Sequence, residues 1–321
     1  MIRSKKHVYA VVSYKEDEHL PYVERHLDSP FVLLDLSTNY LKKNFTFRQN
    51  RGSFVLFLNG EPLTDITSVW YRRMIRATEK DLPIVNSQRP YSVKSLFNFA
   101  NLALSYFPDA TWISAPYVHE RAENKVLQLD IARRIGFNIP DTIVTSSPTE
   151  ALKFVAMQKS AIAKPINQGA LNINRKHYGF YASKVTTKAD FSGLFYSPAI
   201  FQTAIDVDVD IRATVVGNKV FAATIRSKSI DDPSSHVRDW RIANGNPDIK
   251  IEGYTLPKKI VSLCIEHVKE LGLKFGALDL ILDKKGKYWF IENNPAGQWA
   301  FVEDETKQPI GKMLAELLMK G

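Results

Sequence analysis

The most informative segment of the sequence is residues 276–299, GALDLILDKKGKYWFIENNPAGQW. Two β-like apolar runs flank DKKG, so the stretch predicts a β-hairpin whose short loop is centred near residues 284–285. Pairing across that loop puts Asp279 opposite the FIE segment. Side chains two residues apart in an extended chain face the same side, so Glu292 and Asn294 share a face. The hairpin therefore predicts that three oxygen ligands converge at one of its ends.

Asp279, Glu292 and Asn294 form a candidate Mg²⁺ site. Proteins usually hold this ion with one or two carboxylates together with nucleotide phosphates. Asp279 lies within apolar GALDLIL and Glu292 follows YWFI, and a buried carboxylate needs a partner. The alternative interpretation is that both carboxylates are solvated charges at strand ends.

Two lysines are candidates for a phosphate clamp. Lys164 ends the apolar segment AIAKP, and a buried lysine is costly unless it meets an anion. Lys125 opens a helix predicted from NKVLQLDIARRIG, with Asn124 as its N-cap and Gly136 at its C-terminal end. An ordinary exposed lysine is the alternative for Lys125.

The segment IFQTAI can present backbone groups to an adenine ring, although it also fits an ordinary buried strand. In DVDVDIR, the aspartates alternate with valines and Arg212 keeps their parity, which predicts one acidic face. That face suits ribose hydroxyls, a substrate amine or plain solvent. Cations that follow could neutralise charge on a transferred phosphoryl group; they are Arg226, Lys228, Arg238 and Arg241.

The rest of the chain predicts an α/β (α+β) protein with a small, mainly parallel N-terminal sheet. The strands expected there are 7–12, 31–36, 54–58 and 68–72, with helices at 18–27 and 91–107. Farther on, we expect a helix at 149–159 starting near Thr149, a loop at 167–179, a hairpin turn at Gly217–Asn218, and helices at 257–272 and 309–319. The expected units are 1–117, 118–198 and 199–321.

Composition narrows the function. The chain has 321 residues, a net charge of +9 and one cysteine, Cys264. The single cysteine forms no internal disulfide and fits a cytoplasmic location. No apolar stretch approaches the ~20 residues needed to span a membrane. The positive charge favours anionic partners, but the absence of zinc-finger spacing and of an aromatic RNA-binding signature argues against nucleic acid.

The order of these features resembles the ATP-grasp superfamily: a lysine before a helix, Lys164-Pro165, the FQxxI segment, DIRATVVGNKVFAA, GALDLIL and FIENNPAGQW. A finer resemblance is to the ATP-grasp peptide maturases of the microviridin or graspetide type, and it covers roughly residues 5–318. It rests on VWYRR at 69–73, the block at 112–148, RDWR at 238–241 and ENNPAGQW at 292–299. It implies an N-terminal α/β domain, a central lid-like subdomain and a C-terminal antiparallel-sheet subdomain.

The resemblance also implies roles for residues. The two lysines would contact ATP phosphates, Arg212 and Arg241 would orient the acceptor carboxylate or the acyl phosphate, and Asp279, Glu292 and Asn294 would hold Mg²⁺. The backbone around Gln202, Thr203 and Ala204 would meet adenine. These proteins usually carry an acidic residue where Thr203 stands, so the ribose contact passes to Asp206 or Asp208.

The implied function is an ATP-dependent ligase that activates side-chain carboxylates of a ribosomal precursor peptide and forms intramolecular ester or amide crosslinks. The implied partners are a peptide with a leader and an acidic core, and a second copy in a homodimer. Phe191, Leu194 and Phe195, at helical spacing beside Asp190, could form a wall for the leader. The alternatives are a ligase for a free amino acid and a catalytically silent nucleotide-binding protein.

Overall fold

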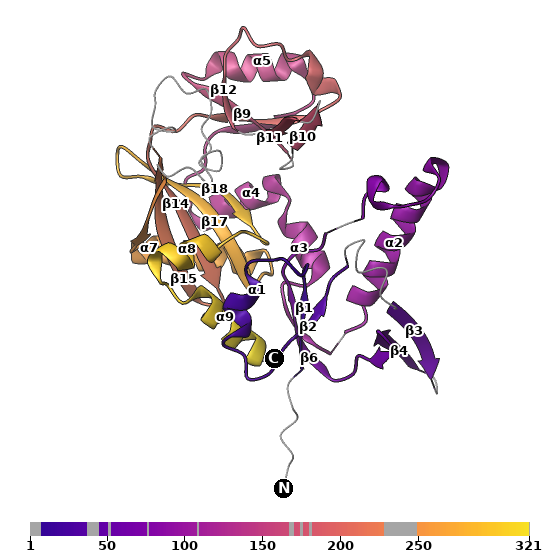
Figure 1. The fold of residues 1–321 in the computed structure, drawn as a ribbon. Coiled ribbons are helices and arrows are strands. Elements are labelled where there is room, and N and C mark those ends of the chain that lie inside the picture. The colour runs from indigo at the N-terminus through magenta and orange to yellow at the C-terminus, as the bar shows by residue number, and fades with distance from the viewer. Residues whose placement is uncertain are drawn as a thin grey trace.

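The computed structural model describes residues 8–36, 45–50, 53–75, 77–107, 109–166, 170–173, 176–179, 182–227 and 249–320. Its sheets belong to an N-terminal unit, a central unit and a C-terminal unit, and the central sheet lies above the C-terminal one in Figure 1. Among the described residues, none of the helices has both the length and the apolar character that crossing a bilayer requires.

The N-terminal unit is built on a parallel sheet, as its pattern predicts. The strand order is β2-β1-β6-β7 and every neighbouring pair is parallel. The strands are β1 (Val8–Val12), β2 (Val32–Leu34), β6 (Ile66–Tyr71) and β7 (Thr111–Ile113), and the helical segments are α1 (Leu20–Glu24), η1 (Glu79–Asp81), η2 (Asn86–Gln88), α2 (Arg89–Leu104) and α3 (Pro116–Ala122).

The strand expected at 54–58 does not join that sheet. It is β4 (Ser53–Leu58), which pairs antiparallel with β3 (Phe45–Asn50) and β5 (Glu61–Pro62). Its buried Leu56 belongs to the same core as Ala100 and Leu104 of α2. The alternation of strands and helices gave no sign of this local antiparallel ribbon, because period two is the same in both kinds of sheet.

The central unit is a four-stranded antiparallel sheet in the order β12-β9-β13-β8. The prediction of a loop at 167–179 is wrong for the described residues, because 170–173 and 176–179 pair as an antiparallel hairpin. The helix expected at 149–159 is confirmed as Pro148–Met157, and its N-cap is Ser147, whose side chain accepts a hydrogen bond from the backbone N–H of Glu150. The elements are β8 (Thr142–Thr145), α5 (Pro148–Met157), β9 (Ala161–Pro165), β10 (Ala170–Ile173), β11 (Lys176–Gly179), β12 (Ser183–Val185), η3 (Ser192–Phe195) and β13 (Ala199–Thr203).

The C-terminal unit is a five-stranded antiparallel sheet in the order β16-β15-β14-β17-β18. Both predicted hairpins are confirmed, and Gly217 and Gly286 adopt the positive φ that their turns require. The strands are β14 (Val207–Val216), β15 (Lys219–Ser227), β16 (Ile249–Tyr254), β17 (Phe275–Asp283) and β18 (Tyr288–Asn294), and the helices are α7 (Lys258–Glu270), α8 (Ala300–Thr306) and α9 (Ile310–Met319).

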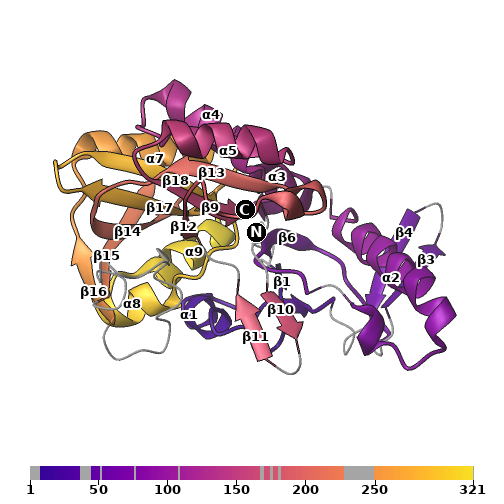
Figure 2. The same cartoon turned by 90° about the horizontal axis from the view of Figure 1, so that it is seen from above.

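Two cores join these units. Helix α4 (Lys125–Ile135), capped by Asn124 as predicted, packs with α7 on one face of the C-terminal sheet. Helix α9 packs on the other face and against β1, β6 and β7, so it lies between the N-terminal and C-terminal sheets (Figure 2). Helix α4 thus shares its core with residues beyond 199, and β13 extends the central sheet past 198. The expected unit boundaries stay a prediction.

Candidate active site

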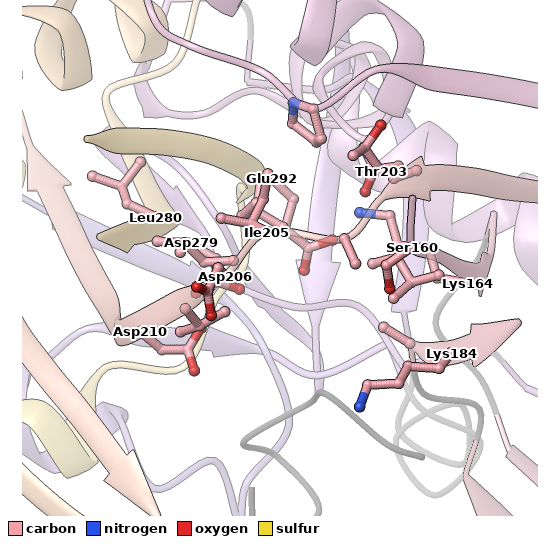
Figure 3. Close-up of a pocket in the computed structure, with 18 of the residues that line it drawn as sticks. Ser160, Lys164, Lys184, Thr203, Ile205, Asp206, Asp210, Asp279, Leu280 and Glu292 are labelled. Carbon is pink, nitrogen blue, oxygen red and sulfur yellow. The ribbon is translucent and has the colours of Figure 1, made fainter. Parts of the chain in front are cut away.

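A pocket of about 570 Å³ lies between the central sheet and the hairpin of β17 and β18 (Figure 3). Residues from β9, β12, β13, β14, β17 and β18 line it. The sequence-predicted site residues among them are Lys164, Gln202, Thr203, Ala204, Asp206, Asp279 and Glu292. The structure therefore brings two of the three candidate metal ligands, one candidate phosphate ligand and the candidate adenine segment to one cavity. The third candidate metal ligand, Asn294, and the other candidate phosphate ligand, Lys125, are not among the lining residues.

The hairpin places charges of opposite sign side by side. Asp279 pairs with Glu292, within the predicted range 290–292, after a register shift between Asp279 and Leu280. On the neighbouring strand β14, Arg212 pairs with Asp279 from the other side. Arg212 Nε lies 3.3 Å from Asp279 Oδ1, and Lys125 Nζ lies 2.9 Å from Glu292 Oε2. All four side chains are more than four-fifths buried. Two carboxylates at this depth are balanced by two cations, which lowers the cost of burying them.

The candidate metal ligands fit Mg²⁺ only together with further oxygens. Among the described residues, no group of three or more His, Cys, Asp or Glu side chains could hold a metal. Asn294 Oδ1 accepts a hydrogen bond from the Ala296 amide at 3.0 Å, and an amide oxygen has a second lone pair for a cation. Two carboxylates and one amide oxygen match an ion that takes its remaining ligands from phosphates and water.

A second lysine accompanies Lys164 in the pocket. Lys184 on β12 stands opposite Ile162, two residues before Lys164 on β9, so both lysines lie on one face of the sheet. Figure 3 shows them on one side of the pocket and Asp279 on the other. Sequence reasoning missed Lys184, because β12 is too short to carry a periodic signal.

The candidate adenine segment has its amide groups committed to the sheet. The backbone N–H groups of Thr203 and Ala204 donate to carbonyl oxygens of the neighbouring segments at 3.0 and 2.9 Å. The buried side chain of Gln202 donates to Thr142 Oγ1 at 2.9 Å. Gln202 therefore holds β13 to β8, and an adenine contact by residues 203–204 would use their carbonyl oxygens.

The prediction of one acidic face on DVDVDIR is wrong. The register of β14 against β17 shifts near the start of the strand, and this irregularity breaks the alternation. Asp206 and Asp210 line the pocket, whereas Asp208 pairs with Arg226 across 3.5 Å on an exposed surface. Asp208 and Arg226 are thus placed outside the pocket lining. Arg241, with Lys228 and Arg238, lies outside the described residues.

The three residues expected to form a leader wall do not share one exposed face. Leu194 is buried and Phe191 packs edge-on against β13, while Phe195 remains 70% exposed. Asp190 accepts a hydrogen bond at 2.9 Å from the backbone amide two residues later. The segment forms the short η3 helix, whose three residues per turn differ from the assumed α-helical spacing.

Gly297, just after the candidate metal ligands, has no room for a side chain. A Cβ there would lie 2.4 Å from Ala277 Cβ and 3.3 Å from an Arg212 guanidinium nitrogen. We expect Gly297→Ala to destabilise the protein by about 1–3 kcal/mol, because crowding of this kind forces backbone shifts. Thermal unfolding measures the effect. Gly193→Ala is the matched control, since nothing lies within 4 Å of its added Cβ, and equal melting temperatures for the two variants would contradict the expected crowding.

Comparison with solved structures identifies the fold. The RiPP-associated ATP-grasp ligase of Chryseobacterium gregarium, in complex with ADP and a leader and core peptide, is 25% identical, covers 98% of this chain and 97% of its own, and has a TM-score of 0.87. This chain has the ATP-grasp fold of the RiPP-associated ligases. The macrocyclase MdnC of Microcystis aeruginosa, bound with precursor peptide MdnA, is 23% identical, with a TM-score of 0.83 and coverage of 98% and 100%.

These likenesses confirm the ATP-grasp fold that the sequence predicts. Among curated proteins, the tetrahydromethanopterin:alpha-L-glutamate ligase of Methanocaldococcus jannaschii is 24% identical over 215 residues, which are 65% of this ATP-grasp chain and 70% of that protein. No family model matches the chain.

Proposed function

We propose that the chain is an ATP-dependent ligase that crosslinks side chains within a ribosomal precursor peptide. The observation that carries this proposal is the pairing of Asp279 and Glu292 at the end of a pocket that also holds Lys164 and Lys184. Two carboxylates facing two lysines across a cavity suit a bound metal–nucleotide. The neighbour from Chryseobacterium gregarium combines the same fold with ADP and a leader and core peptide.

We assign the parts of ATP to the walls of the pocket. Lys164 and Lys184 would contact the phosphates, and β13 would lie along the adenine. Asp206 lines the pocket and Asp208 does not, so we assign the ribose contact to Asp206. Mg²⁺ held by Asp279, Glu292 and Asn294 would supply charge neutralisation at the phosphoryl oxygens.

The proposed chemistry has two balanced steps. A substrate carboxylate oxygen attacks the γ-phosphorus of ATP, which releases ADP and gives an acyl phosphate. A hydroxyl or amine of the same peptide then attacks the carbonyl carbon, loses its proton and expels phosphate. The enzyme contributes positioning and charge. Arg212, buried beside Asp279, would orient the carboxylate or the acyl phosphate. We assign the same orienting role to Arg241.

We infer the acidic character of the peptide from the charge of this chain. A chain with a net charge of +9 attracts an acidic core peptide. The exposed aromatic side chains Phe195 and Tyr196 on the central unit provide apolar surface for an amphipathic leader. A homodimer and a cytoplasmic location stay predictions.

Mass spectrometry of a peptide product tests the proposal. Candidate substrates are drawn from short open reading frames next to this chain's gene that combine Thr, Ser or Lys with Glu or Asp, and each peptide is incubated with ATP and Mg²⁺. We expect ADP and a peptide lighter by one water for each crosslink. A peptide that becomes heavier by one amino-acid residue in the presence of glutamate would contradict crosslinking. It would favour the second candidate function, a ligase for a free amino acid. The similarity to the tetrahydromethanopterin:alpha-L-glutamate ligase supports this candidate. A lack of ADP with every acceptor would indicate a silent nucleotide-binding protein.

A further inference from the structure

A buried polar network lies outside the pocket, at the carboxyl ends of β1 and β6. Its members are Ser13, Asp17, His19 and Arg72, each with at most 3% of its surface exposed. None of the four lines the nucleotide pocket. Burying an arginine and a carboxylate costs a large desolvation energy. Nucleotide binding in the pocket does not explain why these two charged residues are buried here.

Asp17 is the centre of the network. Ser13 Oγ donates to its Oδ2 at 2.6 Å, and Arg72 Nε lies 3.5 Å from the same oxygen. His19 Nδ1 is 2.7 Å from Oδ1. Although burial acts to raise the pKa of Asp17, the hydrogen bond from His19 and the charge of Arg72 hold it well below its usual range. Both Ser13 and His19 donate to Asp17, so His19 is not oriented to take a proton from Ser13.

His19 uses its other ring nitrogen to hold the segment that follows β18. The backbone N–H of Trp299 donates to His19 Nε2 at 3.1 Å. We therefore assign the ring proton to Nδ1, which then donates to Asp17. Arg72 Nη2 also lies 3.1 Å from Nδ1, and in this tautomer that contact is not a hydrogen bond. Burial lowers the pKa of His19 and so favours the neutral ring that this pattern requires. The fully buried indole of Trp299 packs edge-on against the same imidazole, with ring centroids 5.0 Å apart.

Arg72 holds the same segment at a second point. Its Nη1 donates to the backbone oxygen of Ala296. The amide of Ala296 in turn donates to Asn294 Oδ1 at 3.0 Å, and the amide of Gly297 donates to the Asn294 backbone oxygen at 3.1 Å. An ion pair between Asp17 and Arg72, followed by hydrogen bonds through Ala296, therefore links Asp17 on the N-terminal unit to the side chain of Asn294.

We propose that His19 and Arg72 are positioning residues that clamp segment 294–299 and thereby aim the Asn294 oxygen at the metal. This inference rests on the proposed function, which assigns Asn294 to Mg²⁺. Partners outside a metal's own ligands commonly orient those ligands, and their loss costs about 10–100-fold in metal affinity. The clamp also ties the N-terminal unit to the metal site, so the two cannot shift independently.

Two substitutions at His19 separate the clamp from the contact with Asp17. His19→Gln places an acceptor near the position of Nε2 and keeps the bond from Trp299. His19→Asn reaches only the position of Nδ1, so it keeps the bond to Asp17 and loses the clamp. The readout is calorimetric affinity for ADP in the presence of Mg²⁺ and in the presence of a chelator. In the wild-type protein we expect Mg²⁺ to strengthen ADP binding.

We expect His19→Asn to reduce that gain by about tenfold while metal-free ADP affinity stays the same, and His19→Gln to retain most of the gain. Arg72→Lys keeps the charge beside Asp17 but lacks the planar fork of the guanidinium. We expect it to lose the Mg²⁺-dependent gain in ADP affinity, as His19→Asn does. It replaces His19→Asn in the test if that variant does not fold. The positioning role would be overturned if Mg²⁺ strengthened ADP binding in His19→Asn as much as in wild type. The same result in Arg72→Lys would overturn it if His19→Asn does not fold. Equal losses in the two His19 variants would also overturn it. Absence of any gain in wild type would instead contradict the proposed metal site.

Discussion

Glu292→Gln should lose ADP formation by about 10³-fold while the protein remains folded. The substitution keeps the size of the side chain but removes the charge that would hold the metal. Metal ions stabilise several kcal/mol of developing charge in such reactions, and each 1.36 kcal/mol is about tenfold in rate. The change also leaves Lys125, 2.9 Å from this carboxylate, without its anionic partner. A coupled assay for ADP measures the effect.

Glu303→Gln is the matched control. Glu303 is a similarly buried carboxylate on α8, and its oxygen lies 2.6 Å from a guanidinium nitrogen of Arg25. It does not line the pocket. We expect this variant to melt at a lower temperature and to form ADP at the wild-type rate. Wild-type turnover in Glu292→Gln, or an equal loss in both variants, would show that Glu292 has no special role in catalysis.

Lys164→Met should weaken ATP binding by roughly 30-fold, which corresponds to about 2 kcal/mol. Methionine keeps the length and the apolar stem but cannot neutralise a phosphate. We expect the melting temperature to stay the same or to rise, because removing a partly buried charge removes its desolvation cost. Calorimetric titration with a non-hydrolysable ATP analogue gives the affinity directly.

Lys153→Met tests whether any lost lysine has this effect. Lys153 lies on the exposed face of α5, 2.9 Å from Glu150, and does not line the pocket. Its substitution should leave ATP affinity unchanged. If Lys164→Met binds ATP as tightly as Lys153→Met does, Lys164 is an ordinary strand-end lysine and the phosphate clamp must be built from other residues.

The approximate position of the hairpin site could be predicted from the sequence. Once DKKG is recognised as a turn, antiparallel pairing places Asp279 opposite residues 290–292, but the register shift between Asp279 and Leu280 that sets Asp279 opposite Glu292 leaves no mark in the sequence. The prediction failed where regularity fails. The irregular start of β14 moves Asp208 away from the pocket and leaves Asp206 and Asp210 in it, and no residue type in DVDVDIR announces this break.

Residues whose roles depend on contacts between distant elements could not be predicted from the sequence. Lys184 meets the pocket because β12 pairs with β9, and His19 meets Trp299 because α9 draws the N-terminal and C-terminal sheets together. Such pairs are set by how whole elements pack. A periodic pattern describes one element at a time, so it cannot indicate which lysine or histidine another element will face.

The proposed first step, phosphorylation of a peptide carboxylate, can be tested directly with a heavy oxygen isotope. The side-chain carboxylates of the substrate peptide are labelled, and the label is followed during crosslinking. The first step transfers one carboxylate oxygen to the phosphoryl group, so we expect one labelled oxygen in the inorganic phosphate released for each crosslink. Release of unlabelled phosphate together with crosslinked peptide would show that no acyl phosphate forms.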